Sequence, residues 1–202
     1  MFILQHVLDP QSSRKIEVIP DDYRVLDGPC KLDRSTLESW DTTKLYCFKR
    51  LEIAKDVTPQ MLEEKLVALK ARGVIYCPEN LRPLLMKKSA DSQAKFVTYK
   101  DTLLVVDTNY TLTPSYLKYA AGQLTLVVEG NLEISKEVDP DQLFGKLDKV
   151  YNYGNIEVHG DQLGAIQAKL EVNEGNIDDA GAEDPEDESD ENRIGNIGYL
   201  KL

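Results

Sequence analysis

The chain has 202 residues, of which 42% are apolar, and its formal net charge is −11. A chain of this length and composition can bury a substantial core, as one domain or two fused half-domains, so it is not among the small scaffolds that depend on disulfides. The three cysteines, Cys30, Cys47 and Cys77, are odd in number and form no C-x-x-C pair. We expect them to pack as small apolar side chains.

Residues 1–34 are expected to form an N-terminal cap. The segment begins MFILQHVLDPQSSRK, which lacks the basic start and the apolar core of a secretory signal. No run in the sequence approaches the ~20 apolar residues of a membrane span. We therefore expect a cytoplasmic protein that does not bind membranes.

The chain is internally duplicated. Residues 51–75 read LEIAKDVTPQMLEEKLVALKARGVI and residues 132–156 read LEISKEVDPDQLFGKLDKVYNYGNI, with 11 of 25 positions identical and no gap. Such self-similarity is typical of repeat proteins, whose units bury their apolar faces only when stacked. We assign residues 35–112 to a first repeat half and residues 113–177 to a second.

Helix-start signals recur at a nearly regular interval, which indicates about three strand–helix coils in each half. They fall at Ser35, Thr58, Pro78, Thr113, Asp139 and Gly160. The side-chain oxygens of Thr58 and Asp139 suit an N-cap, and Pro59 or Pro140 follows at the first helical position. The two copies are therefore predicted to begin a helix at the same point.

These two helices are predicted to continue as far as a glycine. Apolar residues at i, i+4 and i+7 would form one helical face, made of Leu62, Leu66 and Leu69 in one copy and Leu143, Leu147 and Val150 in the other. Gly73 and Gly154 would end the helices in a left-handed conformation.

The apolar period then changes to two, which predicts strands. Residues 75–77 and 156–158 alternate in this way, as do residues 51–53 and 132–134. We expect one short strand per coil, and successive strands to pair as a parallel sheet. In the second half a Gly-Asn-Ile or Gly-Asn-Leu mark recurs, at residues 130–132, 154–156, 175–177 and 195–197.

A strand and a short helix every 20 to 29 residues, rich in leucine and with an asparagine near the turn, resembles the leucine-rich-repeat class of solenoids. The residues that carry the resemblance are Leu147-x-x-Val150-x-Asn152-x-Gly154-x-Ile156, with Ala71 at the asparagine position of the first copy. The resemblance covers residues 37–177 and implies an α/β solenoid that binds proteins, without any particular activity. A purely β solenoid with G-x-I marks is the rival, which the amphipathic helices disfavour.

The negative charge is concentrated in one segment. Residues 178–192, DDAGAEDPEDESDEN, hold nine of the 35 acidic residues and no basic one, which leaves 26 acidic against 24 basic residues elsewhere. With no large apolar side chain, the segment is predicted to be disordered. Its role is either solubility alone or that of a mobile acidic loop that binds a basic protein surface, mimics nucleic acid or folds back onto the chain's own binding face. Residues 193–202, RIGNIGYLKL, regain an apolar pattern and are predicted to dock as a terminal strand or cap.

No pattern in the sequence indicates catalysis, a cofactor or a metal site. The two histidines, His6 and His159, lack a second ligand at metal-binding spacing, and Ser35 and Ser115 lie outside any G-x-S-x-G motif. Nucleic acid is not predicted as a partner, because the rest of the chain is nearly neutral and Lys87-Lys88 is its only lysine pair.

Residues between the buried strand positions should line one exposed surface. They are Glu52, Tyr76, Glu133 and Glu157. An exposed tyrosine beside carboxylates suits a basic protein partner, although the same residues could serve only to solvate a sheet face. The sequence therefore predicts a non-enzymatic protein–protein interaction module. The alternatives are a self-assembling protein that forms a homodimer or filament, and a regulator or inhibitor that acts through its acidic segment.

Overall fold

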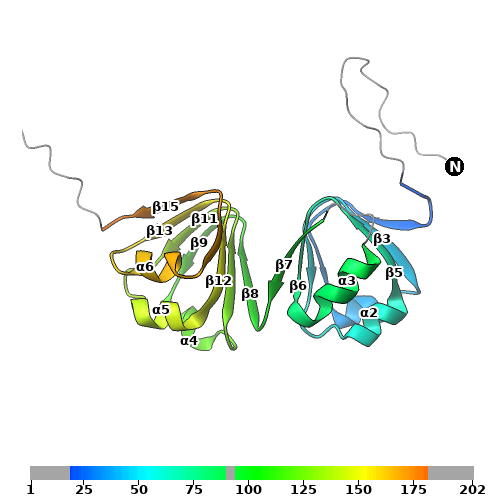
Figure 1. Cartoon of the computed structure of the whole chain (residues 1–202), viewed down its shortest axis with the longest axis horizontal. Helices are drawn as coiled ribbons and strands as arrows, with labels where there is room; N and C mark the ends of the chain where they lie inside the picture. Colours follow the sequence, from blue (N-terminus) through cyan, green and yellow to red (C-terminus); the bar gives the residue numbers. More distant parts are fainter. Residues whose placement is uncertain (1–18, 90–93, 182–202) are drawn as a thin grey trace, which may run out of the picture. The chain divides into compact units, whose positions relative to one another are not determined.

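The computed structural model describes residues 19–89 and 94–181. They divide into two compact units, of which the first ends at Thr98 and the second begins at Tyr99. Both units are mixed α/β arrays of repeated strand–turn–strand–helix units with parallel sheets (Figure 1). The expected division after residue 112 lies too late in the chain, because residues 102–112 form strands of the second unit.

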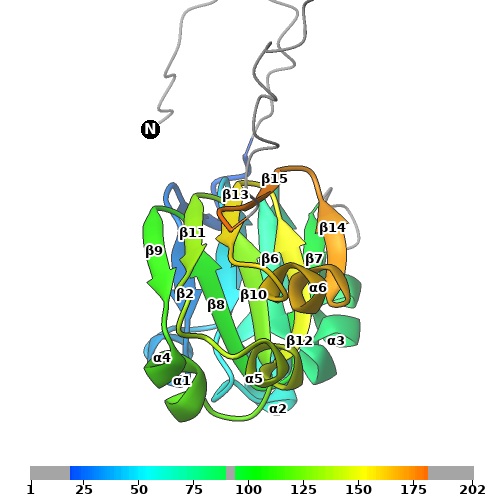
Figure 2. The ribbon, with the colours of Figure 1, turned by 90° about the vertical axis from the view of Figure 1, so that its left-hand side faces the viewer.

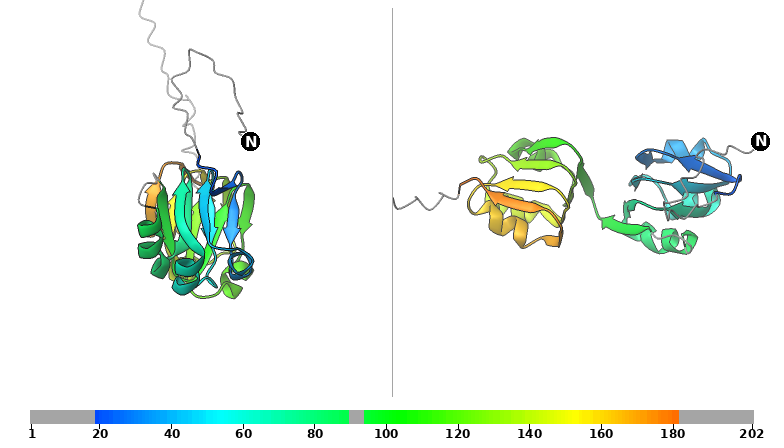
Figure 3. Two further views of the ribbon diagram at one scale, coloured as in Figure 1. Left: turned by 90° about the vertical axis from the view of Figure 1, so that its right-hand side faces the viewer. Right: turned by 90° about the horizontal axis from the view of Figure 1, so that it is seen from above.

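The first unit contains two parallel sheets. Sheet A has the strand order β1-β3-β5, and sheet B has the order β2-β4-β6-β7. Figure 3 shows these strands, coloured from blue to green along the sequence, side by side. The elements are β1 (Tyr23–Leu26), β2 (Cys30–Leu32), α1 (Arg34–Glu38), β3 (Thr43–Cys47), β4 (Leu51–Ile53), α2 (Pro59–Lys65), β5 (Leu66–Ala71), β6 (Val74–Pro78), the 3-10 helix η1 (Glu79–Leu81), α3 (Arg82–Lys88) and β7 (Lys95–Tyr99).

The second unit repeats this plan with four strands in each sheet. Sheet C has the order β14-β12-β10-β8, and sheet D has the order β15-β13-β11-β9. Figure 2 shows α4, α5 and α6 following one another beside the strands. The elements are β8 (Thr102–Val106), β9 (Asn109–Leu112), α4 (Pro114–Tyr119), β10 (Leu124–Val128), β11 (Asn131–Ile134), α5 (Pro140–Lys146), β12 (Leu147–Asn152), β13 (Asn155–Val158), α6 (Gln162–Gln167), β14 (Leu170–Asn173) and β15 (Asn176–Asp179).

Parallel strands and repeated units confirm the coarse sequence prediction, but each repeat supplies two strands instead of one. The strand before the turn enters one sheet, and the strand after the turn enters the other. Together with the helices, the two sheets enclose one apolar core per unit. In β11, for example, Leu132 and Ile134 are buried in the core while Asn131 and Glu133 are exposed. Burial of each such leucine or isoleucine contributes roughly 1.5–3 kcal/mol.

The predicted helix starts in the duplicated segments are confirmed. Thr58 Oγ1 accepts a hydrogen bond from Met61 N at 3.2 Å, and Asp139 Oδ1 accepts one from Gln142 N at 2.8 Å. Proline follows both caps at the start of the helix. An N-cap of this kind stabilises a helix by about 1 kcal/mol.

The predicted ends of these helices are wrong. Helix α2 ends at Lys65, and Leu66 and Leu69 lie in β5, where both are buried. A β-bulge in β5 causes the helix-like spacing of these two leucines. Thr43 pairs with Leu66 but Lys44 pairs with Ala68, so Val67 is an extra residue that turns Leu66 and Leu69 to the same face. Leu147 and Val150 are three residues apart in β12 for the same reason, since the register shifts there too. A bulged strand therefore reproduced a helical spacing.

The predicted role of the two glycines is also wrong, because they lie in the tight turns between sheets and do not end helices. A Cβ atom at Gly154 would lie 2.1 Å from the carbonyl oxygen of Gly130, and one at Gly73 would lie 2.5 Å from that of Lys49. Backbone of the preceding repeat occupies the space that a side chain would need. Close stacking of repeats therefore requires glycine at these turns.

The ends of the chain differ in part from the expected cap and tail. Residues 19–34 include β1 and β2, which form the strands of a first repeat, and Asp178 and Asp179 of the expected acidic segment lie in β15. The rest of that segment after Gly181 and the predicted strand at residues 193–202 lie outside the described residues. No helix in the described ranges is long and apolar enough to cross a membrane.

Replacing Gly154 with alanine should lower the free energy of unfolding by at least about 2 kcal/mol, because the new methyl group overlaps a backbone carbonyl. Gly145 in α5 is the matched control, since no atom lies within 4 Å of the place its Cβ would take. Gly145→Ala should stabilise the protein by up to about 1 kcal/mol, as alanine favours a helix. Urea denaturation measures both. Equal stability of Gly154→Ala and the parent protein would contradict the stacking argument.

Candidate functional site

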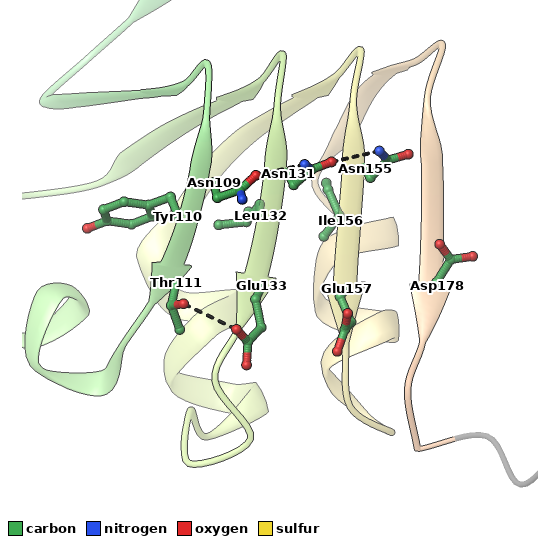
Figure 4. A pocket seen from close by; sticks show the side chains of 10 residues that line it. All are labelled: Asn109, Tyr110, Thr111, Asn131, Leu132, Glu133, Asn155, Ile156, Glu157 and Asp178. Carbon is green, nitrogen blue, oxygen red and sulfur yellow. Dashed lines mark hydrogen bonds between the residues drawn. The ribbon is translucent and has the colours of Figure 1, made fainter.

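The outer face of sheet D carries two parallel rows of polar side chains (Figure 4). Strands β9, β11, β13 and β15 pair in register, so equivalent residues align across the sheet. One row consists of Asn109, Asn131, Asn155 and Asn176, and the other of Thr111, Glu133, Glu157 and Asp178. Leu132 and Ile156, which lie between the rows, point into the core.

The asparagines form a continuous hydrogen-bonded ladder. Asn131 Nδ2 donates to Asn109 Oδ1 at 2.8 Å, Asn155 Nδ2 donates to Asn131 Oδ1 at 2.8 Å, and Asn176 Nδ2 donates to Asn155 Oδ1 at 3.1 Å. The distance between neighbouring strands, about 4.8 Å, is the distance that stacked amide side chains need. All donors in the ladder point toward β9, so the ladder has a direction.

A buried asparagine fixes the turn behind this face. Asn152 is fully buried, and its Nδ2 donates to Asn173 Oδ1 at 2.8 Å and to the carbonyl oxygen of Asn176 at 3.0 Å. Its Oδ1 accepts a hydrogen bond from the backbone of Gly154 at 3.2 Å. A buried polar group with all its partners holds one local geometry. The outer face of sheet D therefore rests on a turn that is held by side-chain hydrogen bonds.

The acidic row lacks counter-charges. Glu133, Glu157 and Asp178 are exposed, and in the described part of the chain none of them forms an ion pair with a lysine or arginine. Only Thr111, whose Oγ1 donates to Glu133 Oε2 at 3.2 Å, contributes a hydrogen-bond donor to the row. Like charges directly opposite one another on neighbouring strands destabilise a sheet. The row therefore presents negative charge at some expense of stability.

The two rows, apart from Asn176, line a shallow depression of about 330 Å³, together with Tyr110, Leu132 and Ile156. Tyr110 lies at its β9 end, where its ring meets the ring of Tyr116 edge-on with centroids 6.1 Å apart. In Figure 4, Tyr110 extends away from the acidic row. The depression is open to solvent, which suits a peptide or protein surface better than an enclosed small molecule.

Only two of the four predicted partner-binding residues lie on this face. Glu133 and Glu157 face each other across β11 and β13. Glu52 and Tyr76 face each other across β4 and β6 in the first unit, so the four residues do not share one sheet. The carboxylate of Glu52 forms an ion pair with Lys31 at 2.5 Å.

Tyr76 does not have the exposure that was predicted for it. The residue is fully buried, although it points away from the core residues Ile75 and Cys77 of the same strand. Alternation along a strand tells which face a side chain occupies, but it does not tell whether that face is covered. The prediction of an exposed tyrosine anchor at this position is therefore wrong.

Sequence reasoning missed Asn109, Thr111 and Asp178. Asn109 lies at the spacing of the other asparagines, but Thr108 precedes it instead of glycine, so the Gly-Asn mark does not include it. Asp178 was assigned to the acidic segment, while in the structure it continues the acidic row. The near-equal spacing of all four asparagines was the signal that could have found the face.

Potential nucleophiles and metal ligands lie elsewhere. Cys47 and Cys77 are buried in the apolar core as expected, and burial raises the pKa of both thiols to about 12. His159 is half-buried after β13, and His6 lies outside the described residues. Within residues 19–89 and 94–181, no three His, Cys, Asp or Glu side chains are placed so as to hold a metal ion.

Glu157→Gln should raise the free energy of unfolding by about 0.5 kcal/mol at low salt, because it removes the central charge of the acidic row. The gain should disappear at about 1 M salt, where charges on the surface are screened. Glu171→Gln in β14 is the matched control, as Glu171 faces no carboxylate across the sheet. A stabilisation that is equal in both variants would contradict repulsion within the row.

Thiol labelling should separate the cysteines. At pH 8 a thiol whose pKa is about 12 is ionised in roughly one molecule in ten thousand, and only the thiolate reacts. Iodoacetamide should therefore label the half-buried Cys30 before Cys47 or Cys77, as read by mass spectrometry of the digested protein. First labelling of Cys47 or Cys77 would contradict their burial in the core.

Comparisons with known proteins identify no relative. No model of a protein family, no curated protein and no solved structure matches this chain.

Proposed function

We propose that this protein is a non-enzymatic interaction module of the solenoid type, which binds a basic protein segment on the outer face of sheet D. The observation that carries the proposal is the row of Glu133, Glu157 and Asp178, in register and without a counter-charge in the described part of the chain. A row of like charges lowers stability, so its presence needs another reason. Binding of a cationic partner supplies that reason.

The geometry suits arginine and lysine side chains. Paired strands lie about 4.8 Å apart, so carboxylates that face each other on adjacent strands are close enough for one guanidinium to contact two of them. The asparagine ladder runs beside the acidic row and offers amide groups to the backbone of a bound segment. Charge would steer the encounter, and the rigid sheet would limit the entropy lost on binding.

The solenoid assignment rests on the stacking of repeats. In solenoids each repeat contacts its neighbours, and equivalent residues line one extended binding surface. The in-register rows on sheet D have this property. We place the fold near the leucine-rich-repeat class in architecture, with the difference that each repeat here has a second strand.

The proposal is tested by charge reversal at the centre of the acidic row. Glu157→Lys should weaken binding of a fluorescent Arg-Ser alternating peptide of about eight residues, long enough to cross four strands, by about tenfold in fluorescence anisotropy. Glu171→Lys is the matched control, because it makes the same charge change at an exposed strand position of sheet C. Binding should also weaken as salt is raised.

Two results would contradict the proposal. An equal loss in both variants would mean that only the net charge of the protein attracts the peptide. Unchanged binding in Glu157→Lys would mean that the peptide binds elsewhere.

A further inference from the structure

The last strand of sheet D leaves the core of the second unit incomplete. Within the described residues, β15 pairs with β13 on one side and ends the sheet on the other. Leu132 and Ile156 are almost completely buried, whereas Ile177, at the same level in β15, is only partly buried. A further strand would cover Ile177 in the way that β15 covers Ile156.

The asparagine ladder is also unfinished at this edge. Asn176 Nδ2 donates to Asn155, but no donor in the described part of the chain reaches Asn176 Oδ1. The direction of the ladder specifies what the next strand must bring. It must place an asparagine at this level, with its Nδ2 toward β15.

The sequence contains a segment with these features outside the described residues. Gly195-Asn196-Ile197 repeats the mark of Gly175-Asn176-Ile177. The connection has a suitable length, since 16 residues separate Asp179 from Asn196 and 17 separate Val158 from Asn176 in the preceding repeat. Residues 188–192, which precede this segment, are mostly acidic. The comparison with the preceding repeat therefore predicts an added strand in sheet D only, and none in sheet C.

We propose that the segment around Asn196 binds the free edge of β15 as an added parallel strand, with Asn196 on Asn176 and Ile197 on Ile177. In this register Gly195 lies over the carbonyl group of Gly175. Gly175 lies over the carbonyl group of Gly154 in the same way, and a Cβ atom on Gly175 would be 1.9 Å from that carbonyl oxygen. The acidic residues that precede Gly195 then form the connection between β15 and the added strand.

A second copy of the chain is the competing occupant. Asn109 Nδ2 at the opposite edge of sheet D donates to no described residue, so a β9 edge could in principle continue the ladder of another molecule. The tethered segment has the advantage of a local concentration in the millimolar range. The chain's own segment is therefore the occupant that we infer.

Hydrogen exchange of the full-length protein tests the proposal. Amides of β15 should exchange about tenfold faster in Ile197→Asp and in Gly195→Ala, because either change opens the edge. Gly198→Ala is the matched control, as Gly198 aligns with the outward-facing Asp178 and tolerates a methyl group. Amides of β11 are the internal reference, and they should exchange equally in all four proteins.

Equal exchange of β15 in the parent protein and both test variants would overturn the proposal. The proposal would also be overturned if light scattering gave a dimeric mass and the β15 amides lost their protection from exchange on dilution. The occupant of the edge would then be a second copy of the chain. Faster exchange in Gly198→Ala, equal to that in Gly195→Ala, would overturn the register of the added strand.

Discussion

The close approach of successive turns is the constraint on which the second unit depends. Gly154 passes over the carbonyl of Gly130, and Gly175 passes over that of Gly154, at distances that exclude any side chain. This contact sets the turns of neighbouring repeats at the separation of hydrogen-bonded strands. The ladder of Asn131, Asn155 and their neighbours forms at the residue that follows each glycine, because the register is already set there. The position of every outward side chain on sheet D follows from that register.

The same register explains why the acidic row is a candidate for function instead of stability. Parallel pairing without slippage places Glu133, Glu157 and Asp178 at one level, and the fixed strand spacing prevents them from moving apart. Asparagines stacked at this distance satisfy each other, whereas carboxylates repel. One register thus produces a stabilising row and a destabilising row side by side. Selection for stability alone accounts for the first row and leaves the second without a reason.

Sequence reasoning could predict the repeats, the parallel strands and the helix starts, because these depend on local chemistry such as the Thr58 and Asp139 caps. It failed where tertiary pairing changed a local pattern. The bulge at Val67 gave the buried residues of a strand the spacing of a helix face. Gly154 was predicted to end a helix because its close contact with the preceding repeat cannot be inferred from the sequence of one repeat. For the site, alternation correctly turned Glu133 and Glu157 outward, while the burial of Tyr76 depends on what covers its sheet.

A comparison of the two copies shows where this site could arise. Core positions such as Leu51 and Leu132 match, but the positions of Asn131 and Asn155 are Arg50 and Val74 in the first copy. The first copy therefore cannot build the ladder. Its counterpart of Glu133, Glu52, is neutralised by Lys31, and Tyr76 replaces the next acid.

The first unit thus keeps the stacking plan and lacks both polar rows. Because the same architecture forms without them, the rows are not needed for the fold. Their restriction to the second unit is what is expected if one copy of a duplicated array acquired a binding face while the other retained a structural role.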